Sequence, residues 1–372
     1  MKKTQPLLLP YTSNNLRLPN RVVMAPMTRN RATNEANRPT EDLHAKYYAQ
    51  RSSAGLIISE GTQISEEAVG YVNTPGIHTM EQLTGWRLVT EKVHAGGGRI
   101  FAQLWHVGRI SHPDFHQGKP PLAPSAINPY ATVFTPEGEK ETVTPRAMSQ
   151  QDIDRTVNDF AQAAENALDA GFDGVEIHSS NGYLLHQFFS STSNHRTDAY
   201  GGSHENKTRI LFQILDTMKK SIPEQKIGLR LNPSLHGIFG MTLDADSLPT
   251  FDYLVHRLND YDLAYLHLSE PFNDVSDNPH AETEVARRYR PIYKGTLMIN
   301  AHFDQEKGNA VLERGDADLV AFGKLFISNP DLVERFEHHV PLTDWDASTF
   351  YTPGPKGYTD YEAKAREGSA AK

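Results

Sequence analysis

The sequence contains no cysteine among its 372 residues. Disulfide bonds, cysteine-ligated zinc, iron–sulfur clusters and a catalytic thiol are therefore excluded, because each of them needs a cysteine sulfur. Positive charge is also in deficit: 37 Lys and Arg stand against 46 Asp and Glu, which gives a formal net charge of −9. Nucleic acids and anionic membrane surfaces are bound by clustered Lys and Arg, so neither is expected as a partner.

Long hydrophobic runs are missing as well. No stretch approaches the roughly 18 consecutive apolar residues that suggest a membrane-spanning helix. The segment Met1–Pro10 has three leucines between two prolines, which is too short for the apolar region of a signal peptide. The remaining composition, 38% hydrophobic and 22% charged, is that of an ordinary globular protein. We therefore expect a cytoplasmic protein, a monomer or a homodimer, with no membrane segment.

Strand-like and helix-like segments alternate along the chain. Short apolar runs predict eight strands, at 20–28, 55–61, 99–106, 174–177, 226–231, 263–268, 296–301 and 318–322. Helix signals predict eight helices between and after them, at 40–53, 80–95, 149–171, 206–220, 248–258, 282–293, 304–314 and 330–338. Eight strand–helix pairs indicate an α/β fold, a closed (β/α)₈ (TIM) barrel forming a single domain over 1–372.

The main alternative fold is a doubly wound parallel sheet. Such a sheet normally carries a Gly-rich fingerprint directly after its first strand. Here Ala25, Pro26, Met27 and Thr28 follow the first apolar run instead. The barrel is therefore preferred.

Two segments depart from the alternation. The segment 107–146 contains seven prolines and little periodicity, and it follows the third strand. We interpret it as an excursion that caps the C-terminal side of the barrel and places a hairpin over the site. The segment 340–372 follows the last helix as a C-terminal tail.

The stretch 172–209 organises the rest of the chain. Its apolar start predicts a buried strand, and that strand breaks at His178, Asn181 and Tyr183. Three hydrogen-bonding side chains therefore lie at the C-terminal lip of a barrel strand, where barrel enzymes carry out their chemistry. The polar segment that follows is too long for a simple connection, and we interpret it as a packed functional loop.

The other strand ends carry mostly neutral hydrogen-bonding residues and one buried cation. These residues are Thr28, Glu60, Gly61, Gln103, Trp105, His106, Arg230, Asn300, Ala301, His302, Gly323 and Lys324. The set lacks the carboxylate pair of a glycosidase and the HxH pair plus acidic ligand of a metal hydrolase, so no metal site is expected. It is typical of a cradle for a planar cofactor with a phosphate tail, which barrels bind after strands seven and eight.

Seven segments, in order along nearly the whole chain, resemble one family. They read NRVVMAPMTRNR (20–31), SAGLIISEGTQIS (53–65), AQLWHVGRIS (102–111), HSSNGYLLHQFFSSTSNHRTDAYGGSHENKTR (178–209), GLRLNP (228–233), AFGKLFISNPDLVERF (321–336) and FYTPGPKGYTDY (350–361). The chain resembles the Old Yellow Enzyme family of FMN-dependent ene-reductases, particularly its bacterial branch of nitrate-ester and N-ethylmaleimide reductases. The resemblance implies tightly but non-covalently bound FMN and NADPH or NADH as reductant. The implied substrates are electrophilic alkenes or nitro compounds: enones, maleimides, nitroalkenes and nitrate esters.

The same resemblance implies roles for individual residues. The cofactor-binding set is Ala25, Pro26, Met27, Thr28, Gly61, Gln103, His178, Arg230, Ala301, Gly323 and Lys324. Within it, Thr28 is similar to the residue beside the flavin C4 carbonyl, Gln103 to the grip on the pyrimidine edge, and Arg230 to the cation near N1. His178 and Asn181 match the donors that hold the substrate oxygen, and Tyr183 matches the proton donor. Tyr71, Trp105 and Tyr351 are implied to line the substrate face.

The chemistry is consistent with these roles. Hydride addition to an enone builds negative charge on its oxygen, which two neutral donors already in place stabilise. A phenol near its ordinary pKa of about 10 is a competent proton donor, so we expect no lowered pKa for Tyr183. Arg230 lies inside an apolar run, and a buried arginine needs a partner.

Two departures from the family pattern concern the phosphate end. Relatives mostly carry Arg where this chain has Lys324, and Gly near Asn300, Ala301 and His302. Lysine lacks the bidentate grip of arginine on phosphate, so we expect lower flavin affinity.

Other readings of the same residues stay open. A metal-dependent hydrolase using some of the 17 histidines is one alternative, and a lyase or aldolase with a Schiff base on Lys324 is another. Taken singly, His178 reads as a structural histidine, Asn181 as a turn residue before Gly182, and Tyr183 as a packing residue. Their grouping favours the catalytic interpretation.

Overall fold

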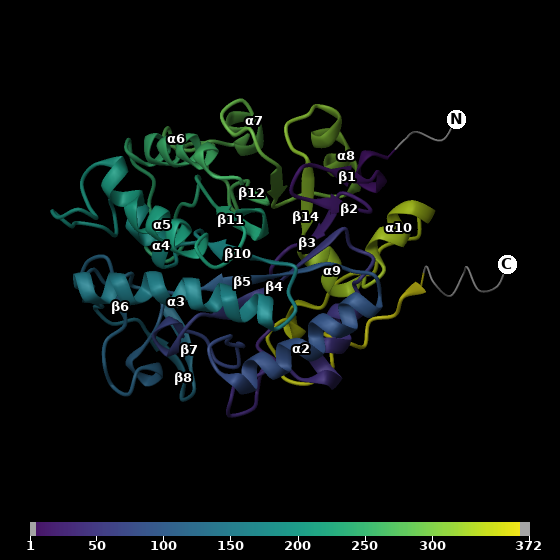
Figure 1. Ribbon diagram of the computed structural model, residues 1–372, viewed down its shortest axis with the longest axis horizontal. Coiled ribbons are helices and arrows are strands. Elements are labelled where there is room, and N and C mark those ends of the chain that lie inside the picture. Colours follow the sequence, from purple (N-terminus) through teal and green to yellow (C-terminus); the bar gives the residue numbers. More distant parts are fainter. Residues whose placement is uncertain (1–4, 365–372) are drawn as a thin grey trace.

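The computed structural model describes residues 5–364. Eight parallel strands close into a barrel in the order β10-β11-β12-β13-β14-β3-β4-β5, which confirms the predicted fold (Figure 1). The barrel strands are β3 (Val22–Met24), β4 (Leu56–Gln63), β5 (Ile100–Trp105), β10 (Gly174–His178), β11 (Ile227–Leu231), β12 (Tyr265–Ser269), β13 (Leu297–Asn300) and β14 (Leu319–Phe322). Each overlaps the range expected from the sequence.

Helices surround the strands (Figure 1). They are α1 (Lys46–Ala49), α2 (Met80–Ala95), α3 (Gln150–Asp169), α4 (Leu184–Phe189), α5 (His204–Met218), α6 (Ser247–Arg257), α7 (Val285–Tyr289), α8 (Gln305–Glu313), α9 (Lys324–Ser328) and α10 (Leu332–His338). The start expected for α3 is confirmed, because the Ser149 side chain accepts from the Asp152 backbone N–H and Asp152 in turn accepts from the Ser149 N–H. Its end is confirmed by Gly171, whose φ of +88° suits glycine.

Four expectations about local structure were wrong. The helix expected at 40–53 is a π-helical turn, Glu41–Ala45, followed by the short α1, and the helix expected at 282–293 is only α7. The loop after β10 contains α4, whose six residues are all buried; the sequence analysis read them as loop because they lie among polar residues. The helix α9, directly after β14, was also missed. It ends before Pro330, which has no N–H to continue a helix.

The first barrel strand is shorter than expected. Only Val22–Met24 pairs with both neighbours, although the apolar pattern extends to Thr28. The chain leaves the ladder after the Ala25 N–H donates to Phe322 O at 3.0 Å. Residues 25–28 are thereby free to line the space above the barrel.

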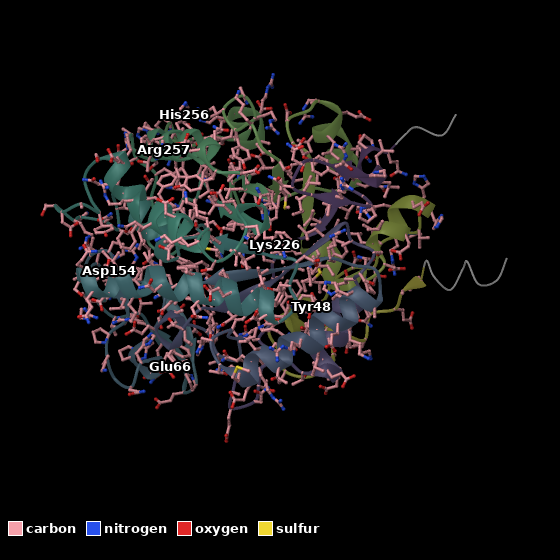
Figure 2. All side chains as sticks on the ribbon, in the orientation of Figure 1. Tyr48, Glu66, Asp154, Lys226, His256 and Arg257 are labelled. Carbon is pink, nitrogen blue, oxygen red and sulfur yellow. The ribbon has the colours of Figure 1, made fainter. Side chains whose placement is uncertain are left out.

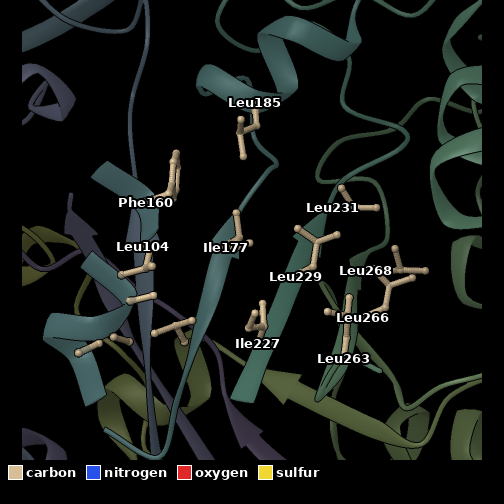
Figure 3. Close-up of a cluster of buried hydrophobic side chains, with 14 of the residues drawn as sticks. Leu104, Phe160, Ile177, Leu185, Ile227, Leu229, Leu231, Leu263, Leu266 and Leu268 are labelled. Carbon is tan, nitrogen blue, oxygen red and sulfur yellow. The ribbon is translucent and has the colours of Figure 1, made fainter. Parts of the chain in front are cut away.

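Two apolar layers hold the barrel. The larger lies between strands and helices, and Figure 3 shows part of it, with Ile177, Leu229 and Leu266 projecting from neighbouring strands. A smaller layer fills the lower barrel interior and includes Phe101, Tyr265 and Leu319. Leu16 and Leu18 join this inner layer from the hairpin β1 (Tyr11–Thr12) and β2 (Arg17–Leu18), which the sequence analysis did not predict. The barrel interior is thus closed at its lower end by apolar side chains.

The Pro-rich excursion carries two small sheets. One is a hairpin of β7 (Thr132–Thr135) and β8 (Gly138–Glu141), and the other pairs β6 (Leu122–Ala123) with β9 (Arg146–Ala147). Val133 of the hairpin packs in one buried cluster with Trp105 and Tyr183. The expected hairpin over the site is therefore confirmed.

The outer surface of the helices is polar. Figure 2 shows Asp154 on α3 and His256 and Arg257 on α6 at the periphery, away from the barrel. Within residues 5–364, no helix is both long and apolar enough to cross a membrane.

Candidate active site

A cavity of about 980 Å³ opens over the C-terminal ends of the barrel strands. Fourteen residues expected to form the site line it: Ala25, Pro26, Met27, Thr28, Gln103, Trp105, His178, Asn181, Tyr183, Arg230, Ala301, Gly323, Lys324 and Tyr351. The cavity wall formed by the described residues does not include Gly61 or Tyr71. The volume is at the upper end of what small-molecule and cofactor sites occupy.

Gly61 and Tyr71 both act through Trp105. A side chain at Gly61 would come within 2.5 Å of the Trp105 ring, so glycine is required for that ring to lie flat against β4. The Tyr71 ring stacks on Trp105 with centroids 5.2 Å apart. Both residues therefore contact the Trp105 ring, which forms part of the cavity wall, and their expected roles at the cofactor and the substrate stay predictions.

Arg230 is the one fully buried cation that projects from a barrel strand into the cavity described here. Its Nη2 lies 2.9 Å from the Asn300 amide oxygen when that amide is oriented to satisfy its neighbours, and 3.5 Å from Ser269 Oγ. Its Nε is buried and has no hydrogen-bond partner within residues 5–364. Burial lowers the pKa of Arg230, and the nearby charge of Glu176 opposes that effect. An orphaned donor on a cation at a cavity wall is suited to an electron-rich ligand atom.

Gln103 is held from below by a buried network. Its Nε2 donates to Glu176 Oε1 at 2.8 Å, and Glu176 Oε2 lies 2.8 Å from His267 Nδ1. Glu176 and His267 are completely buried inside the barrel. Neither residue was expected at the site; the signal available in the sequence was an acid and a histidine inside otherwise apolar strands.

His178 and Asn181 form the donor pair of one wall. Ser180 Oγ lies 3.1 Å from His178 Nδ1. Burial lowers the pKa of His178 well below its usual value, with Arg230 adding to the effect, so the ring is neutral. Asn181 Oδ1 accepts from Asn232 Nδ2 at 3.4 Å, which leaves its Nδ2 for a ligand. Asn181 also has a φ of +59° before Gly182, so it is a turn residue as well as a cavity residue.

The Tyr183 hydroxyl lies 3.0 Å from the Tyr71 hydroxyl. The rings of His178 and Tyr183 meet edge to face at 5.1 Å. Burial raises the pKa of Tyr183 well above its usual value, and Tyr71 adds to this. The expectation that the pKa of Tyr183 is not lowered is confirmed, and the rise follows from a burial of the phenol that was not visible from the sequence. Tyr183 is held firmly in its protonated form.

Cations and strained backbone gather at the far end of the cavity, beyond β13 and β14. Lys324 and Lys307 both line it, and the Lys324 ammonium lies 5.8 Å from the centre of the Trp345 ring. Ala301 and His302 have φ of +78° and +58°, a conformation that favours glycine. Ala301 and His302, which lie near the position where relatives mostly have glycine, thus keep a glycine-like backbone conformation, and this conformation is strained for residues other than glycine. Lys307 and Trp345 were not expected at the site. The short spacing of Lys307 after strand seven could have indicated it, whereas no local pattern indicates Trp345.

The C-terminal segment forms part of the wall. Arg29 and Arg31 are buried directly after the Thr28 turn and donate to backbone carbonyls of this segment. Both bond Phe350 O, at 3.0 Å and 2.6 Å, and Arg31 also bonds Thr349 O at 2.8 Å. Tyr351 lies at the cavity rim and is 65% exposed. The tail after the last helix is thus fastened to the first barrel strand.

No group of three or more His, Asp or Glu side chains within residues 5–364 is arranged to hold a metal ion. The buried polar side chains that line the cavity are instead Arg29, Gln103, His178, Arg230 and Asn300. These are donors and acceptors for an organic ligand.

Comparison with known proteins decides which ligand this is. Residues 6–343 match the model of the NADH:flavin oxidoreductase / NADH oxidase family. The chain belongs to this family. It is an FMN-dependent NAD(P)H oxidoreductase of the Old Yellow Enzyme type, so the resemblance seen in the sequence is confirmed.

Relatives with solved structures share the whole barrel of this family member. An Old Yellow Enzyme homologue from Zymomonas mobilis is 39% identical, with a TM-score of 0.90 over 96% of this chain and 99% of that one. Morphinone reductase is 42% identical, with a TM-score of 0.90 over 97% of both chains. Among curated proteins, 12-oxophytodienoate reductase 1 of Oryza sativa subsp. japonica is 40% identical over 96% of this chain and 92% of its own.

The residues present fit the FMN of this family. The unpartnered Arg230 Nε and the two lysines at the far end are donors for the polar ring edge and the phosphate of a flavin nucleotide. We propose that the cofactor-binding set expected from the sequence holds FMN, with Gly61 acting through Trp105. Lys307 and Asn300 are added to that set.

Proposed function

We propose that this enzyme reduces activated C=C bonds with electrons from NADPH or NADH, and that enones, maleimides and nitroalkenes are its substrates. When bound, FMN supplies the hydride that adds to the β-carbon of the alkene. The observation that carries the proposal is the position of Tyr183 next to His178 and Asn181 on one cavity wall.

The donor pair would activate the alkene. In the tautomer whose Nδ1 accepts from Ser180 Oγ, the neutral His178 ring would present Nε2–H, and Asn181 would present Nδ2–H. Two donors at the carbonyl or nitro oxygen stabilise the negative charge that develops there as the β-carbon accepts hydride. Because both groups are neutral and already ordered, they need no reorganisation during the reaction.

Tyr183 would complete the addition. Its hydroxyl proton passes to the α-carbon, and the resulting phenolate is reprotonated from solvent. A raised pKa makes the phenol a weaker acid in the resting enzyme, but the α-carbon of the enolate formed from an enone or a maleimide is a much stronger base than a phenolate. The Tyr71 hydroxyl lies 3.0 Å away and must turn its O–H toward Tyr183 to donate to the phenolate that forms.

Nitrate esters are a second candidate substrate class. The same two donors suit a nitro oxygen, and release of nitrite needs no proton on carbon. Tyr183 would then be dispensable.

The experiment is anaerobic turnover by the purified protein. NADPH or NADH should bleach its yellow colour, and cyclohexenone should restore the colour and be recovered as cyclohexanone. A protein that is bleached but reoxidised only by oxygen would refute alkene reduction. Nitrite release from glyceryl trinitrate, compared between wild type and Tyr183→Phe, tests the second class separately.

A further inference from the structure

Three buried polar side chains lie directly below the cavity, inside the barrel. Gln103 on β5, Glu176 on β10 and His267 on β12 are 3%, 0% and 0% exposed. Glu176 joins the other two, with 2.8 Å from its Oε1 to Gln103 Nε2 and 2.8 Å from its Oε2 to His267 Nδ1. Below them lies the inner apolar layer that contains Phe101 and Tyr265.

This arrangement is costly for folding. Burying a carboxylate in a barrel interior carries a desolvation penalty, and a well-packed apolar replacement is often neutral or stabilising. The histidine does not offset the charge of Glu176. Burial lowers the pKa of His267, the charge of Arg230 lowers it further, and Glu176 raises it. The net effect is a lowered pKa, so the ring is neutral. A buried carboxyl group with no ion pair to Lys or Arg within residues 5–364 calls for a role other than stability.

The hydrogen bonds fix which face Gln103 presents. A glutamine amide can be turned either way, with its oxygen or its nitrogen toward a neighbour. Glu176 Oε1 accepts from Gln103 Nε2, so the amide nitrogen of Gln103 faces Glu176. Since Gln103 also lines the cavity, its Oε1 is the amide atom left for a ligand. His267, donating from Nδ1, fixes the carboxylate in turn.

We propose that Glu176 and His267 are positioning residues that lock the Gln103 amide as a hydrogen-bond acceptor toward the cofactor ring. An acceptor there selects a ring edge with an N–H group, and the pyrimidine edge of the isoalloxazine carries one, N3–H, between two carbonyls. The inference rests on the proposed cofactor-binding role of Gln103. It adds two residues to the site from a layer that does not line the cavity.

The charge of Glu176 has a second consequence. Glu176 on β10 pairs with Gly228 on the neighbouring strand β11, two residues before Arg230, which lines the cavity. The charge of Glu176 opposes the effect of burial on the pKa of Arg230. A fixed cation beside the flavin favours the reduced, more negative form, and a fixed anion beneath that cation weakens the effect. Glu176 therefore sets the flavin midpoint potential lower than Arg230 alone would.

The test measures FMN binding and midpoint potential in Glu176→Gln, which keeps the shape and removes the charge. In this variant both amides can turn either way, so the dissociation constant of oxidised FMN should rise about tenfold. Reduced FMN loses the same fixed acceptor but no longer has the negative charge of Glu176 near its own, so its dissociation constant should stay the same. The midpoint potential should accordingly rise by about 30 mV, the value of a tenfold ratio for two electrons. Unchanged affinity and potential would overturn the proposal. Equal weakening of both redox forms, at unchanged potential, would show a packing role only and would overturn it too.

Two further variants make the test decisive. Asp331→Asn is the matched control, because Asp331 is an equally buried carboxylate, 2.7 Å from Arg335 Nε, that does not line the cavity; its potential should equal that of wild type. If Glu176→Gln does not fold, the double variant Gln103→Glu, Glu176→Gln is used instead. It exchanges the two side chains and so keeps one amide–carboxylate pair. The exchange moves the charge to the cavity wall, so its potential should fall below wild type, and a potential at or above wild type would reject the proposal.

These readouts need no alkene. A wild-type protein that binds FMN but does not reduce cyclohexenone would refute the proposed function and leave this inference to be decided by the potentials. A wild type that reduces cyclohexenone, together with folded variants whose midpoint potentials equal that of wild type, would support the proposed function and refute this inference.

Discussion

The hydroxyl oxygens of Tyr71 and Tyr183 lie 3.0 Å apart, so one hydrogen bond links a residue on the cavity wall to one behind it. Tyr71 comes from the segment after β4, and Tyr183 from the turn that precedes α4. Both rings pack on Trp105, at 5.2 Å and 5.0 Å between centroids. The Tyr183 side chain is therefore held by the Trp105 ring through packing and by the Tyr71 hydroxyl through a hydrogen bond.

Removing the Tyr183 hydroxyl separates the two half-reactions. Tyr183→Phe should bind FMN and be reduced by NADPH as wild type is, while cyclohexenone reduction slows by about 10² or more, the usual contribution of a positioned proton donor. Stopped-flow traces of flavin bleaching and recovery measure both steps. Tyr71→Phe is the matched control and should slow alkene reduction less, because the donor remains. Equal alkene turnover in Tyr183→Phe and wild type would eliminate Tyr183 as the donor.

The His178 and Asn181 pair should bind phenolate-like anions to the oxidised enzyme. We expect the double variant His178→Ala, Asn181→Ala to weaken binding of a substituted phenol by about 100-fold, since two hydrogen bonds to a charged oxygen are lost. Titration of the long-wavelength absorbance of the flavin–phenol complex gives the dissociation constants. The two single variants should each account for part of the loss. Unaltered phenol affinity in the double variant would remove the pair from the oxyanion role.

Lys324 is predicted to hold the flavin phosphate less well than arginine would. In the structure its ammonium lies over the Trp345 ring, and lysine offers one point of charge where arginine offers a fork. Lys324→Arg should therefore tighten FMN binding by about threefold to tenfold, measured by fluorescence quenching during titration of apoprotein. Lys307→Ala should weaken it, because Lys307 is the second cation lining that end. If Lys324→Arg binds FMN with the affinity of wild type, the lysine at this position does not weaken phosphate binding.

Arg31 is predicted to hold the C-terminal segment against the cavity. It donates to Phe350 O, Thr349 O and Lys356 O, so a shorter-reaching lysine must leave some of these carbonyls unpaired. Arg31→Lys should lose about 2–4 kcal/mol of unfolding free energy and expose the segment around Phe350 to limited proteolysis. Arg38→Lys, on the exposed loop that precedes α1, is the matched surface control. If Arg31→Lys is cleaved at the same rate as wild type, Arg31 does not hold the C-terminal segment against the cavity.

The sequence was sufficient for the barrel because its strands are buried on both faces and read as short apolar runs. It was also sufficient for most of the cavity, since residues at the C-terminal ends of parallel strands converge whatever their order in the chain. Thr28, Gln103, His178 and Arg230 could be grouped on that ground alone, and all four line the cavity.

What the sequence did not reveal depends on non-local contacts. Trp345 reaches the cavity only because the tail folds back across the barrel, and Gly61 supports it only because the Trp105 ring lies against that glycine. The raised pKa of Tyr183 comes from its burial and from the phenols of Tyr71 and Tyr351, which are both distant from it in the sequence. Neither periodicity nor strand-end position carries that information.

Buried neutral histidines predict acid sensitivity of the fold. Burial lowers the pKa of His44, His106 and His186 to about 3, against about 6.5 in an unfolded chain. Between these values the unfolded state binds protons that the native state does not, so each histidine lowers the unfolding free energy as pH falls through 6.5. By pH 5 the loss is about 2 kcal/mol per histidine. Glu60, whose pKa burial raises to about 7, acts in the opposite direction, so a single-site variant is needed to isolate the effect.

His44→Gln supplies that variant, because His44 is completely buried and does not line the cavity. Urea unfolding at pH 7 and pH 5 should show a difference between the two pH values that is about 2 kcal/mol smaller in His44→Gln than in wild type. The control is His256→Gln on the exposed face of α6, which should leave the wild-type pH dependence in place (Figure 2). If His44→Gln loses as much stability as wild type between pH 7 and pH 5, His44 already takes up its proton in the folded protein. Acid sensitivity must then come from the carboxylates.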